Sequence, residues 1–293
     1  MVNALLQRGH EPVAALSDKP RHALRADVPT LRLDLTRPKS IMEALDRAGV
    51  DTVIHCAAYG VDYREQDLDK ALRINVVGTL QLFDAAHRAG IGRFLHVGTS
   101  YEYGDHPGPI SETMPLLPDG LYASTKAAAS LLLLGLRRRT PPKILIVRPF
   151  GMYGPGEGSH KLVPQVLSAV SNSTPLDLTD GTEVRDYVPV NDVARGVAEL
   201  AVLPEDEFPA GHVFNVCSGN GRSVRDFVSA LAVAAGGDLA MLRFGRLPNR
   251  PDAPARVVGD PTRWRAFWDH LGRSDVAAET ALADVVTQMQ KEA

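Results

Sequence analysis

The sequence of 293 residues has little cysteine and no long apolar run. Its two cysteines, Cys56 and Cys217, cannot form a disulfide framework, and both lie in apolar, strand-like runs, which predicts buried, reduced thiols. The strongest apolar run, SLLLLGL at 130–136, is far too short to span a bilayer. The first residues lack the charged region and the cleavage site of a signal peptide. We therefore expect a cytoplasmic protein.

An excess of charge of one sign is also missing. The formal net charge is −3 and the isoelectric point is near 6.3, which gives no reason to expect nucleic acid or an anionic membrane as a partner. The basic run RRRTPPK at 137–143 falls where a helix is expected to end, and cations suit a helix C-terminus. We predict no metal site.

Strand-like and helical patterns alternate up to about residue 150. The expected strands lie at 12–16, 30–35, 51–58, 93–100 and 143–150, and the expected helices at 38–48, 67–89 and 119–139. The strands are nearly continuous apolar runs, as in parallel sheets that helices cover on both faces. The pattern predicts a doubly wound, Rossmann-like α/β domain.

Shorter elements and more frequent proline follow residue 150. We expect helices at 160–171, 191–202, 223–235, 261–270 and 276–291, a strand at 212–216, and a strand pair within 176–189. This change predicts a dinucleotide-binding domain over 1–154 and a smaller α/β substrate lobe over 155–293, partly interleaved with it. A crevice between two such lobes is the usual ligand site.

The stretch YASTK at 122–126 carries the sharpest chemical signal. Tyr122 and Lys126 are four residues apart and share a helix face, and an ammonium beside a phenol favours the phenolate. Lowering a tyrosine pKa from about 10 to about 7 needs roughly 4 kcal/mol, which a lysine and a cationic nicotinamide together supply. Thr99 offers a hydroxyl that orients the reacting oxygen. Taken alone, this spacing is common by chance and also fits a surface pair on a helix.

Further motifs, which follow one another in a fixed order, favour a catalytic pair over a surface pair on a helix. They are LDLT at 33–36, IHCAA at 54–58, NVVGT at 75–79, TSYEYG at 99–104, RPFGMYGPG at 148–156, KLVP at 161–164 and GTEVRDYVPVNDVA at 181–194. Together they resemble the extended short-chain dehydrogenase/reductase family, in its NAD-dependent epimerase/dehydratase branch that acts on nucleotide sugars. The resemblance extends through nearly the whole chain.

The resemblance implies roles for individual residues. It assigns a catalytic triad of Thr99, Tyr122 and Lys126. The cofactor-binding residues that it implies are Ser17, Asp18, Asp34, Leu35, Cys56, Ala57, Ala58, Asn75, Tyr122, Lys126 and Pro149. The substrate-binding residues that it implies are Thr99, Ser100, Gly151, Lys161, Leu162, Arg185 and Arg250, with both arginines directed at a diphosphate. The implied substrate is a nucleoside-diphosphate sugar.

The segment LSDKPR at 16–21 bears on the choice of cofactor. Asp18 can hold a ribose hydroxyl and favour NAD, whereas Ser17 with Lys19 or Arg21 can accept the 2′-phosphate of NADP. We favour NAD and leave NADP possible. The resemblance also implies a homodimer through the helices at 67–89 and 119–139.

Departures from the family pattern reduce the number of reactions that we expect this chain to support. Sugar 4,6-dehydratases of the family carry Asp-Glu directly after the catalytic threonine, where this chain has Ser100 and Tyr101. Without these carboxylates the elimination of water lacks its acid and base, so we predict an epimerase or a 4-ketosugar reductase. Gly151 replaces an asparagine of the family pattern and removes a substrate contact. Glu102 is expected to be a structural hydrogen-bond partner.

The chain opens on MVNALLQRGHEPVAAL, a helix end, a turn at Gly9 and a strand. In the family, a strand and a Gly-rich turn that binds the pyrophosphate precede such a helix, and nothing in 1–16 can serve as this turn. We expect Met1 to be an internal methionine of a longer protein, the sheet either to keep a gap or to re-pair, and the chain as given to have weak or no activity. The alternative is a non-catalytic remnant that binds a nucleotide sugar or a partner protein.

Overall fold

The computed structural model describes residues 1–17, 25–62, 64–139, 141–249 and 254–292. The chain divides into two compact units. Unit 1 comprises Met1–Glu102, Leu116–Arg148 and Val197–Phe214, and unit 2 comprises Tyr103–Pro115, Pro149–Gly196 and Asn215–Ala293. The chain leaves unit 1 after Arg148, shortly before the predicted boundary at 154, and later returns to it for 197–214.

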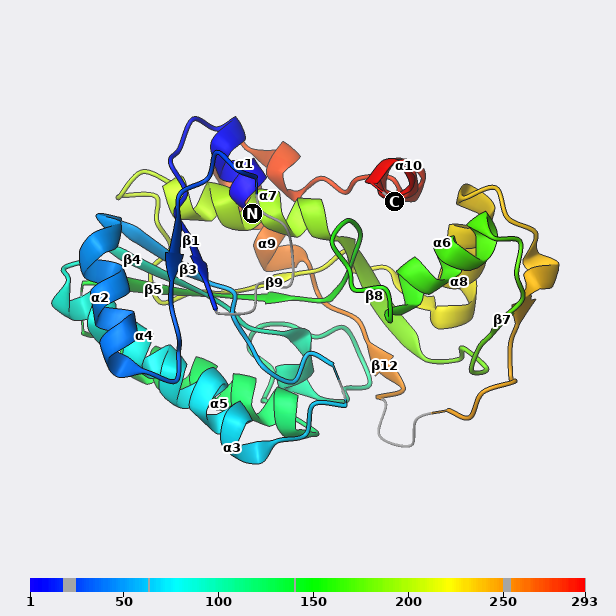
Figure 1. Ribbon diagram of the computed structural model, residues 1–293, viewed down its shortest axis with the longest axis horizontal. Coiled ribbons are helices and arrows are strands. Elements are labelled where there is room, and N and C mark those ends of the chain that lie inside the picture. The colour runs from blue at the N-terminus through cyan, green and yellow to red at the C-terminus, as the bar shows by residue number, and fades with distance from the viewer. Residues whose placement is uncertain (18–24, 63, 140, 250–253, 293) are drawn as a thin grey trace. The chain divides into compact units, whose positions relative to one another are not determined.

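A four-stranded sheet with the order β3-β4-β5-β9 forms the centre of unit 1. Its strands are β3 (Thr52–His55), β4 (Arg93–Val97), β5 (Lys143–Pro149) and β9 (Val213–Val216), and the first three run parallel. The helices α2 (Pro38–Ala48), α4 (Thr79–Arg88) and α5 (Leu121–Gly135) lie on one face, and α7 (Val190–Val202), whose second half belongs to unit 1, lies on the other (Figure 1). The predicted doubly wound α/β fold is confirmed.

Apolar side chains from both layers fill the space between the sheet and these helices. Ile41 of α2, Phe83 of α4, Phe94 of β4 and Ile144 of β5 are almost completely buried in one cluster. The rings of Phe83 and Phe94 meet edge to face with their centroids 5.6 Å apart, a favourable aromatic geometry. This core holds the carboxyl ends of β3, β4 and β5 side by side, where the predicted catalytic residues lie.

The first two strands form a separate parallel pair. β1 (Ala14–Leu16) follows α1 (Val2–Gln7) and pairs with β2 (Thr30–Arg32). Within the described residues, neither strand is hydrogen-bonded to the sheet of β3. Of the two alternatives that the sequence left open, the described residues show the gap and not a re-paired sheet.

The helix predicted over 67–89 consists of three segments. α3 (Leu68–Ala71) leads into a π-helical segment η1 (Leu72–Gly78), which continues as α4. Such π-helical insertions occur often at functional sites. Within η1, a β-carbon on Gly78 would lie 2.8 Å from the backbone oxygen of Leu35, so the close approach of these two segments requires glycine.

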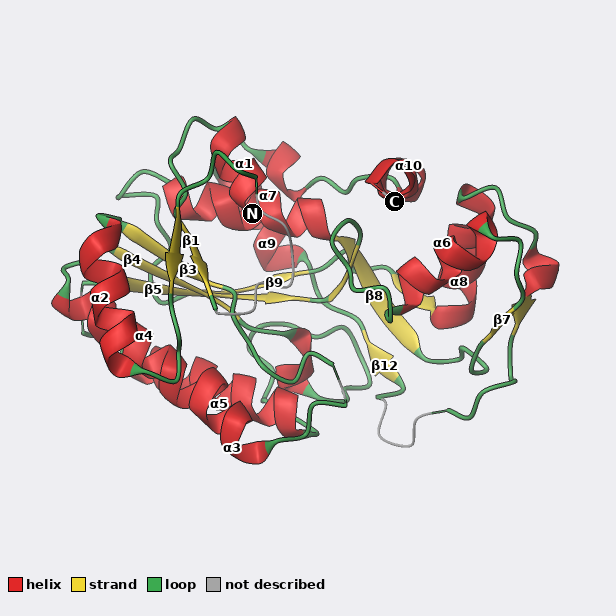
Figure 2. Cartoon of the chain, viewed as in Figure 1, coloured by secondary structure: helices red, strands yellow, loops and turns green. Residues whose placement is uncertain are grey.

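Strand β8 (Val184–Pro189) is the centre of unit 2. It pairs with β10 (Gly221–Ser223), β12 (Arg256–Val257) and β6 (Gly151–Tyr153). Figure 2 shows the helices α6 (Leu162–Ser171), α8 (Val224–Ala234) and α10 (Leu282–Glu292) in red. Side chains from all three contribute to the core of this unit. The remaining elements are α9 (Thr262–His270) and the 3-10 turns η2 (Ser100–Tyr103), η3 (Leu239–Met241) and η4 (Ser274–Ala277).

The predicted strand pair within 176–189 is wrong. β7 (Leu176–Asp177) pairs with β11 (Leu242–Arg243), not with β8. The reason lies in the connecting turn, where the Asp180 carboxylate accepts the Thr182 N–H at 3.0 Å and Gly181 takes a positive φ of 70°. This local turn redirects the chain, so each strand finds a partner from a distant part of the sequence.

None of the described helices has both the length and the apolar character needed to cross a membrane.

Replacing Gly78 by alanine should lower the free energy of unfolding. The new methyl group would meet the Leu35 carbonyl at 2.8 Å, and overpacking of this kind costs about 1–3 kcal/mol. Gly135, at the end of α5, is a matched control because a β-carbon there has no heavy atom within 4 Å. Denaturant unfolding should show Gly78→Ala to be less stable than the parent and Gly135→Ala not; equal stabilities would contradict the close approach.

Candidate active site

Thr99 and Tyr122 meet at the carboxyl end of β4. Thr99 follows this strand and is almost buried, and Tyr122 lies in the first turn of α5. Their side chains are hydrogen-bonded to each other. The structure thus brings together two of the three predicted catalytic side chains in one unit.

Lys126 lies one turn further along α5 and is only 2% exposed. Its Nζ donates a hydrogen bond to the Val97 carbonyl at 2.7 Å and lies 3.5 Å from Nε2 of His96. Burial lowers the pKa of Lys126 to about 8, although the negative charge of Glu102 opposes this shift. The ammonium is therefore directed at the end of β4.

The protonation state of Tyr122 differs from the expectation. The sequence predicted a phenol pKa lowered by Lys126, but burial raises the pKa of Tyr122 to about 12. The hydrogen bond with Thr99 lowers this pKa, and the negative charge of Glu102 raises it. Loss of hydration outweighs the other effects because the lysine donates its hydrogen bond to Val97. In the protein alone the phenol therefore holds its proton.

Asn75, from the NVVGT motif, ties the segment after β3 to α5. Its side-chain oxygen accepts the Tyr59 N–H at 2.8 Å, and its Nδ2 donates to the Tyr59 carbonyl and to Thr125 Oγ1, each at 2.9 Å. The carboxamide of this predicted cofactor residue is therefore fully engaged within the protein. It positions the residues around it.

Two buried histidines, which the sequence analysis did not single out, lie beside Lys126. His55 and His96 are register partners on β3 and β4, and His55 Nε2 is 2.8 Å from Thr79 Oγ1. Burial, followed by the charge of Lys126, lowers the pKa of His55 to about 3 and holds the pKa of His96 well below its usual range. Both rings are therefore neutral at ordinary pH. The sequence feature that could have indicated this pair is a histidine in each of two apolar strands that are adjacent in the sheet.

The residues after β3 fit a flat cofactor ring. Cys56 and Ala57 are exposed and Ala58 is half-buried, so small side chains border the carboxyl end of a parallel strand. Dinucleotides bind at this end of doubly wound sheets. The side chains present therefore leave room for a dinucleotide there.

The other predicted cofactor residues have varied surroundings. The Asp34 carboxylate accepts the N–H and the hydroxyl of Thr36 at 2.9 and 2.7 Å, and these bonds lower its pKa. The side chain of Leu35 is part of the core, which leaves only its backbone for a ligand. Ser17, directly after β1, is exposed, and Pro149 is buried at the end of β5. Asp18 and Arg250 lie outside the described residues.

Unit 2 holds the other predicted substrate residues. A β-carbon at Gly151 would lie 2.8 Å from the Asp186 carbonyl, so the close pairing of β6 with β8 explains why glycine replaces the asparagine. Arg185 is half-buried on β8, and its Nη1 donates to the Val184 carbonyl at 2.9 Å. Lys161 and Leu162 stand at the start of α6.

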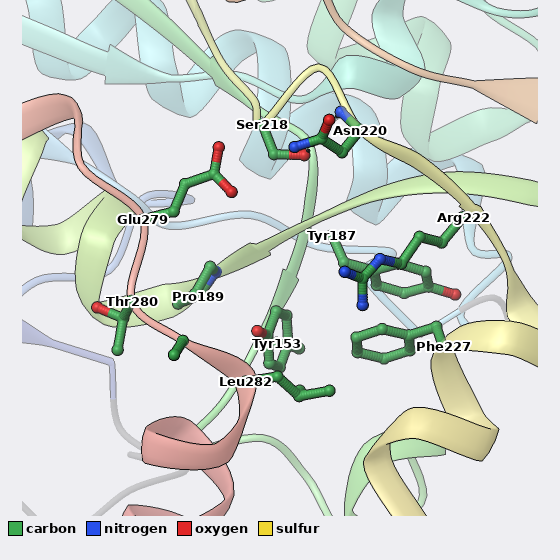
Figure 3. Close-up of a pocket in the computed structure, with 11 residues that line it drawn as sticks. Tyr153, Tyr187, Pro189, Ser218, Asn220, Arg222, Phe227, Glu279, Thr280 and Leu282 are labelled. Atoms are coloured by element: carbon green, nitrogen blue, oxygen red, sulfur yellow. Dashed lines mark hydrogen bonds between the residues drawn. The ribbon is translucent and has the colours of Figure 1, made fainter. Parts of the chain in front are cut away.

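A cavity of about 250 Å³ opens in unit 2 next to these residues. Its lining includes the stacked rings of Tyr187 and Phe227, whose centroids are 3.6 Å apart (Figure 3). Arg222 and Glu279 approach it from opposite sides. The sequence analysis missed Arg222, although it is the register partner of Arg185 and follows the predicted strand at 212–216 closely. The cavity offers aromatic faces and a cation within one pocket.

Comparison with known proteins identifies the family of this chain. The sequence model of the NAD dependent epimerase/dehydratase family matches residues 1–217. The chain belongs to this family. The predicted resemblance is thereby confirmed.

Relatives within the family perform different reactions. The dTDP-glucose 4,6-dehydratase of Streptomyces griseus is 32% identical over 219 residues, which cover 74% of this chain and 65% of that protein. The GDP-6-deoxy-D-mannose reductase of Pseudomonas aeruginosa is 30% identical over 245 residues, covering 80% of this chain and 74% of the reductase. The fold matches the UDP-glucose 4-epimerase of Thermus thermophilus in complex with NAD, with a TM-score of 0.85, 27% identity, and coverage of 100% of this chain and 95% of that one. These relatives are enzymes, so membership of the family alone does not choose among their reactions.

The buried ammonium of Lys126 should make stability depend on pH. Its pKa is lowered from 10.5 to about 8 in the folded chain, so between these values the unfolded chain binds more protons, and the free energy of unfolding rises with pH. The slope reaches about 1.4 kcal/mol per pH unit. Denaturant titrations of Lys126→Met should lack this rise, whereas Lys39→Met, which changes an exposed lysine of α2, should keep it. An unchanged slope in Lys126→Met would contradict the burial of the charge.

Proposed function

We propose that this chain carries the active site of an NAD(P)-dependent epimerase or 4-ketosugar reductase for a nucleoside-diphosphate sugar. The observation that carries the proposal is the pair of hydrogen-bonded hydroxyls, Thr99 and Tyr122, next to a buried lysine at the carboxyl end of β4. This arrangement suits the removal of a proton from a sugar hydroxyl at the end of a strand where a dinucleotide ring fits. In the proposal, unit 1 binds the dinucleotide and unit 2 binds the nucleotide sugar.

The residues after Thr99 argue against dehydration, although relatives include a dehydratase. Ser100 is 4% exposed and Tyr101 is 43% exposed, and neither carries a carboxylate. The nearest carboxylate in the segment, Glu102, is completely buried and already bonded to Thr99 and Arg148. Elimination of water from a sugar therefore lacks a free acid and base in this segment.

Each residue of the triad has a distinct task in the proposed reaction. Tyr122 takes the proton from the sugar hydroxyl, and Thr99 holds the same oxygen in place. Lys126 supplies positive charge beneath the phenol. When bound, the nicotinamide accepts or returns a hydride. Returning it to the other face of the sugar gives epimerisation, and net consumption of the reduced cofactor gives a 4-ketosugar reductase.

The pocket of unit 2 supports a nucleotide as the anionic part of the substrate. Arg222 has no ion pair with any described residue, and it lies beside the rings of Tyr187 and Phe227. A guanidinium next to aromatic faces suits a phosphate joined to a planar base. Arg185, its neighbour in the sheet, adds a second cation.

A homodimer through α3–α5 forms part of the proposal. The side chains of Leu68, Leu72, Leu131 and Leu132 are 60%, 43%, 57% and 46% exposed. Phe83 of α4, in contrast, is completely buried in the core beneath the sheet and is not available to a partner. Exposed leucines on neighbouring helices are typical of an interface between subunits.

Tyr122→Phe should abolish hydride transfer without abolishing binding. The variant retains the ring but loses the hydroxyl, so formation of the 4-epimer from UDP-glucose or dTDP-glucose, or consumption of NAD(P)H by a 4-ketosugar nucleotide, should fall by at least about 100-fold. Thermal shifts with NAD(H), NADP(H), UDP and dTDP should remain. Stabilisation of the parent by UDP or dTDP, with no effect of any dinucleotide and no turnover, would instead favour the non-catalytic binder.

Arg222→Met should weaken binding of UDP and dTDP about tenfold, the effect of one charge-assisted hydrogen bond. Arg225→Met is a matched control because Arg225, on the neighbouring α8, donates to the Asp180 carbonyl and stacks over Phe244. Titration calorimetry should give the parent and Arg225→Met the same affinity for UDP and for dTDP. Equal affinity in all three proteins would remove Arg222 from the proposed site.

A further inference from the structure

A buried ion pair lies directly behind the candidate catalytic residues. Glu102, in η2, is 0% exposed, and Arg148, near the end of β5, is 2% exposed. Arg148 Nε donates to Glu102 Oε2 at 2.8 Å. Charged side chains are rarely buried so completely, because removing them from water is costly unless each one is paired.

The second carboxylate oxygen of Glu102 holds the backbone of Thr99. The Thr99 N–H donates to Glu102 Oε1 at 3.0 Å. The residue before it must leave room for the carboxylate, because a β-carbon on Gly98 would lie 2.3 Å from the same oxygen. The carboxylate therefore joins the end of β4 to the end of β5 through two donors, one on each strand.

We propose that Glu102 and Arg148 are positioning residues that fix the backbone of Thr99, so that its hydroxyl meets the hydroxyl of Tyr122. The proposal rests on the proposed function of this site. A carboxylate suits the task because both of its oxygens accept hydrogen bonds, whereas an amide offers one accepting oxygen and one donating nitrogen. Arg148 orients the carboxylate through its hydrogen bond to Oε2.

The charge of Glu102 also reaches the reacting group. It raises the pKa of Tyr122 and the pKa of Lys126. Among the described residues, Tyr101 and Glu102 on η2 act on the phenol, and Glu102 and Cys56 act on Lys126. Lys126 in turn acts on His55 of β3 and His96 of β4, and Arg148 of β5 also acts on His96. Loss of the negative charge should therefore lower the pKa of Tyr122.

Three variants test the positioning role. In Glu102→Gln, the single amide oxygen has two donors to satisfy, and the buried guanidinium should capture it and leave the Thr99 N–H without an acceptor. In the double variant Glu102→Gln/Arg148→Met, the same oxygen is free to accept the Thr99 N–H again. Glu199→Gln is the control, because Glu199 is a nearly buried carboxylate in unit 1 that pairs with Arg8, away from the triad.

The first readout is hydrogen exchange of the Thr99 amide, resolved by NMR, which needs no substrate. Exchange should speed up about tenfold in Glu102→Gln, the equivalent of one lost hydrogen bond. It should return close to the parent rate in the double variant and stay unchanged in Glu199→Gln. Parent-like exchange in Glu102→Gln, or equal acceleration in Glu199→Gln, would overturn the proposal.

The second readout is turnover of a nucleotide sugar, followed as the 4-epimer formed from UDP-glucose or dTDP-glucose or as NAD(P)H consumed by a 4-ketosugar nucleotide. The kcat of Glu102→Gln should fall about tenfold with little change in KM, and the double variant should recover most of it. The acid limb of the kcat profile should move to lower pH in Glu102→Gln, because the phenol loses a negative neighbour. A lower melting temperature with a parent-like kcat and pH profile would assign the pair a purely structural role. Absence of turnover in the parent would count against the proposed function alone, since amide exchange still decides the positioning.

Discussion

The candidate active site depends on how charges are accommodated where water does not reach, at the carboxyl ends of β3, β4 and β5. Lys126, Arg148 and Glu102 are all almost completely buried, and each has a partner inside the protein. The two histidines beside them stay neutral, because burial and the nearby ammonium oppose their protonation. The site therefore carries one net positive charge that solvent does not screen. Unpaired, any of these groups would cost several kcal/mol.

This charge balance affects the chemistry that the site can perform. The phenol of Tyr122 is buried strongly enough to hold its proton, and a buried lysine alone does not overcome the loss of hydration. Under the proposed function, Tyr122 becomes a base only when further positive charge lies beside it. Proton removal is then coupled to occupancy of the cofactor site. The same burial that suppresses ionisation keeps Tyr122 and Thr99 in a single hydrogen-bonded arrangement.

In the pocket of unit 2, charged side chains remain in contact with solvent. This pocket is lined by rings packed against the core and by side chains that remain accessible, with Arg222 and Glu279 exposed and Phe227 buried. Under the proposed function, the aromatic rings and the Arg222 guanidinium, which has no ion pair with a described residue, together favour an anion attached to a flat ring. The replacement of asparagine by Gly151 belongs to the same architecture, because the Asp186 carbonyl occupies the space of a side chain.

The sequence by itself determined the α/β fold, the family and the set of residues at the strand ends. These follow from local patterns, since helical spacing places Tyr122 and Lys126 on one face and apolar runs mark buried strands. Only the tertiary structure decided which groups those residues meet. The direction of the Lys126 ammonium, the two partners of Glu102, the separation of β7 from β8 and the raised pKa of Tyr122 all depend on segments far apart in the chain. Burial and strand register set these features, and both arise only when distant residues pack together.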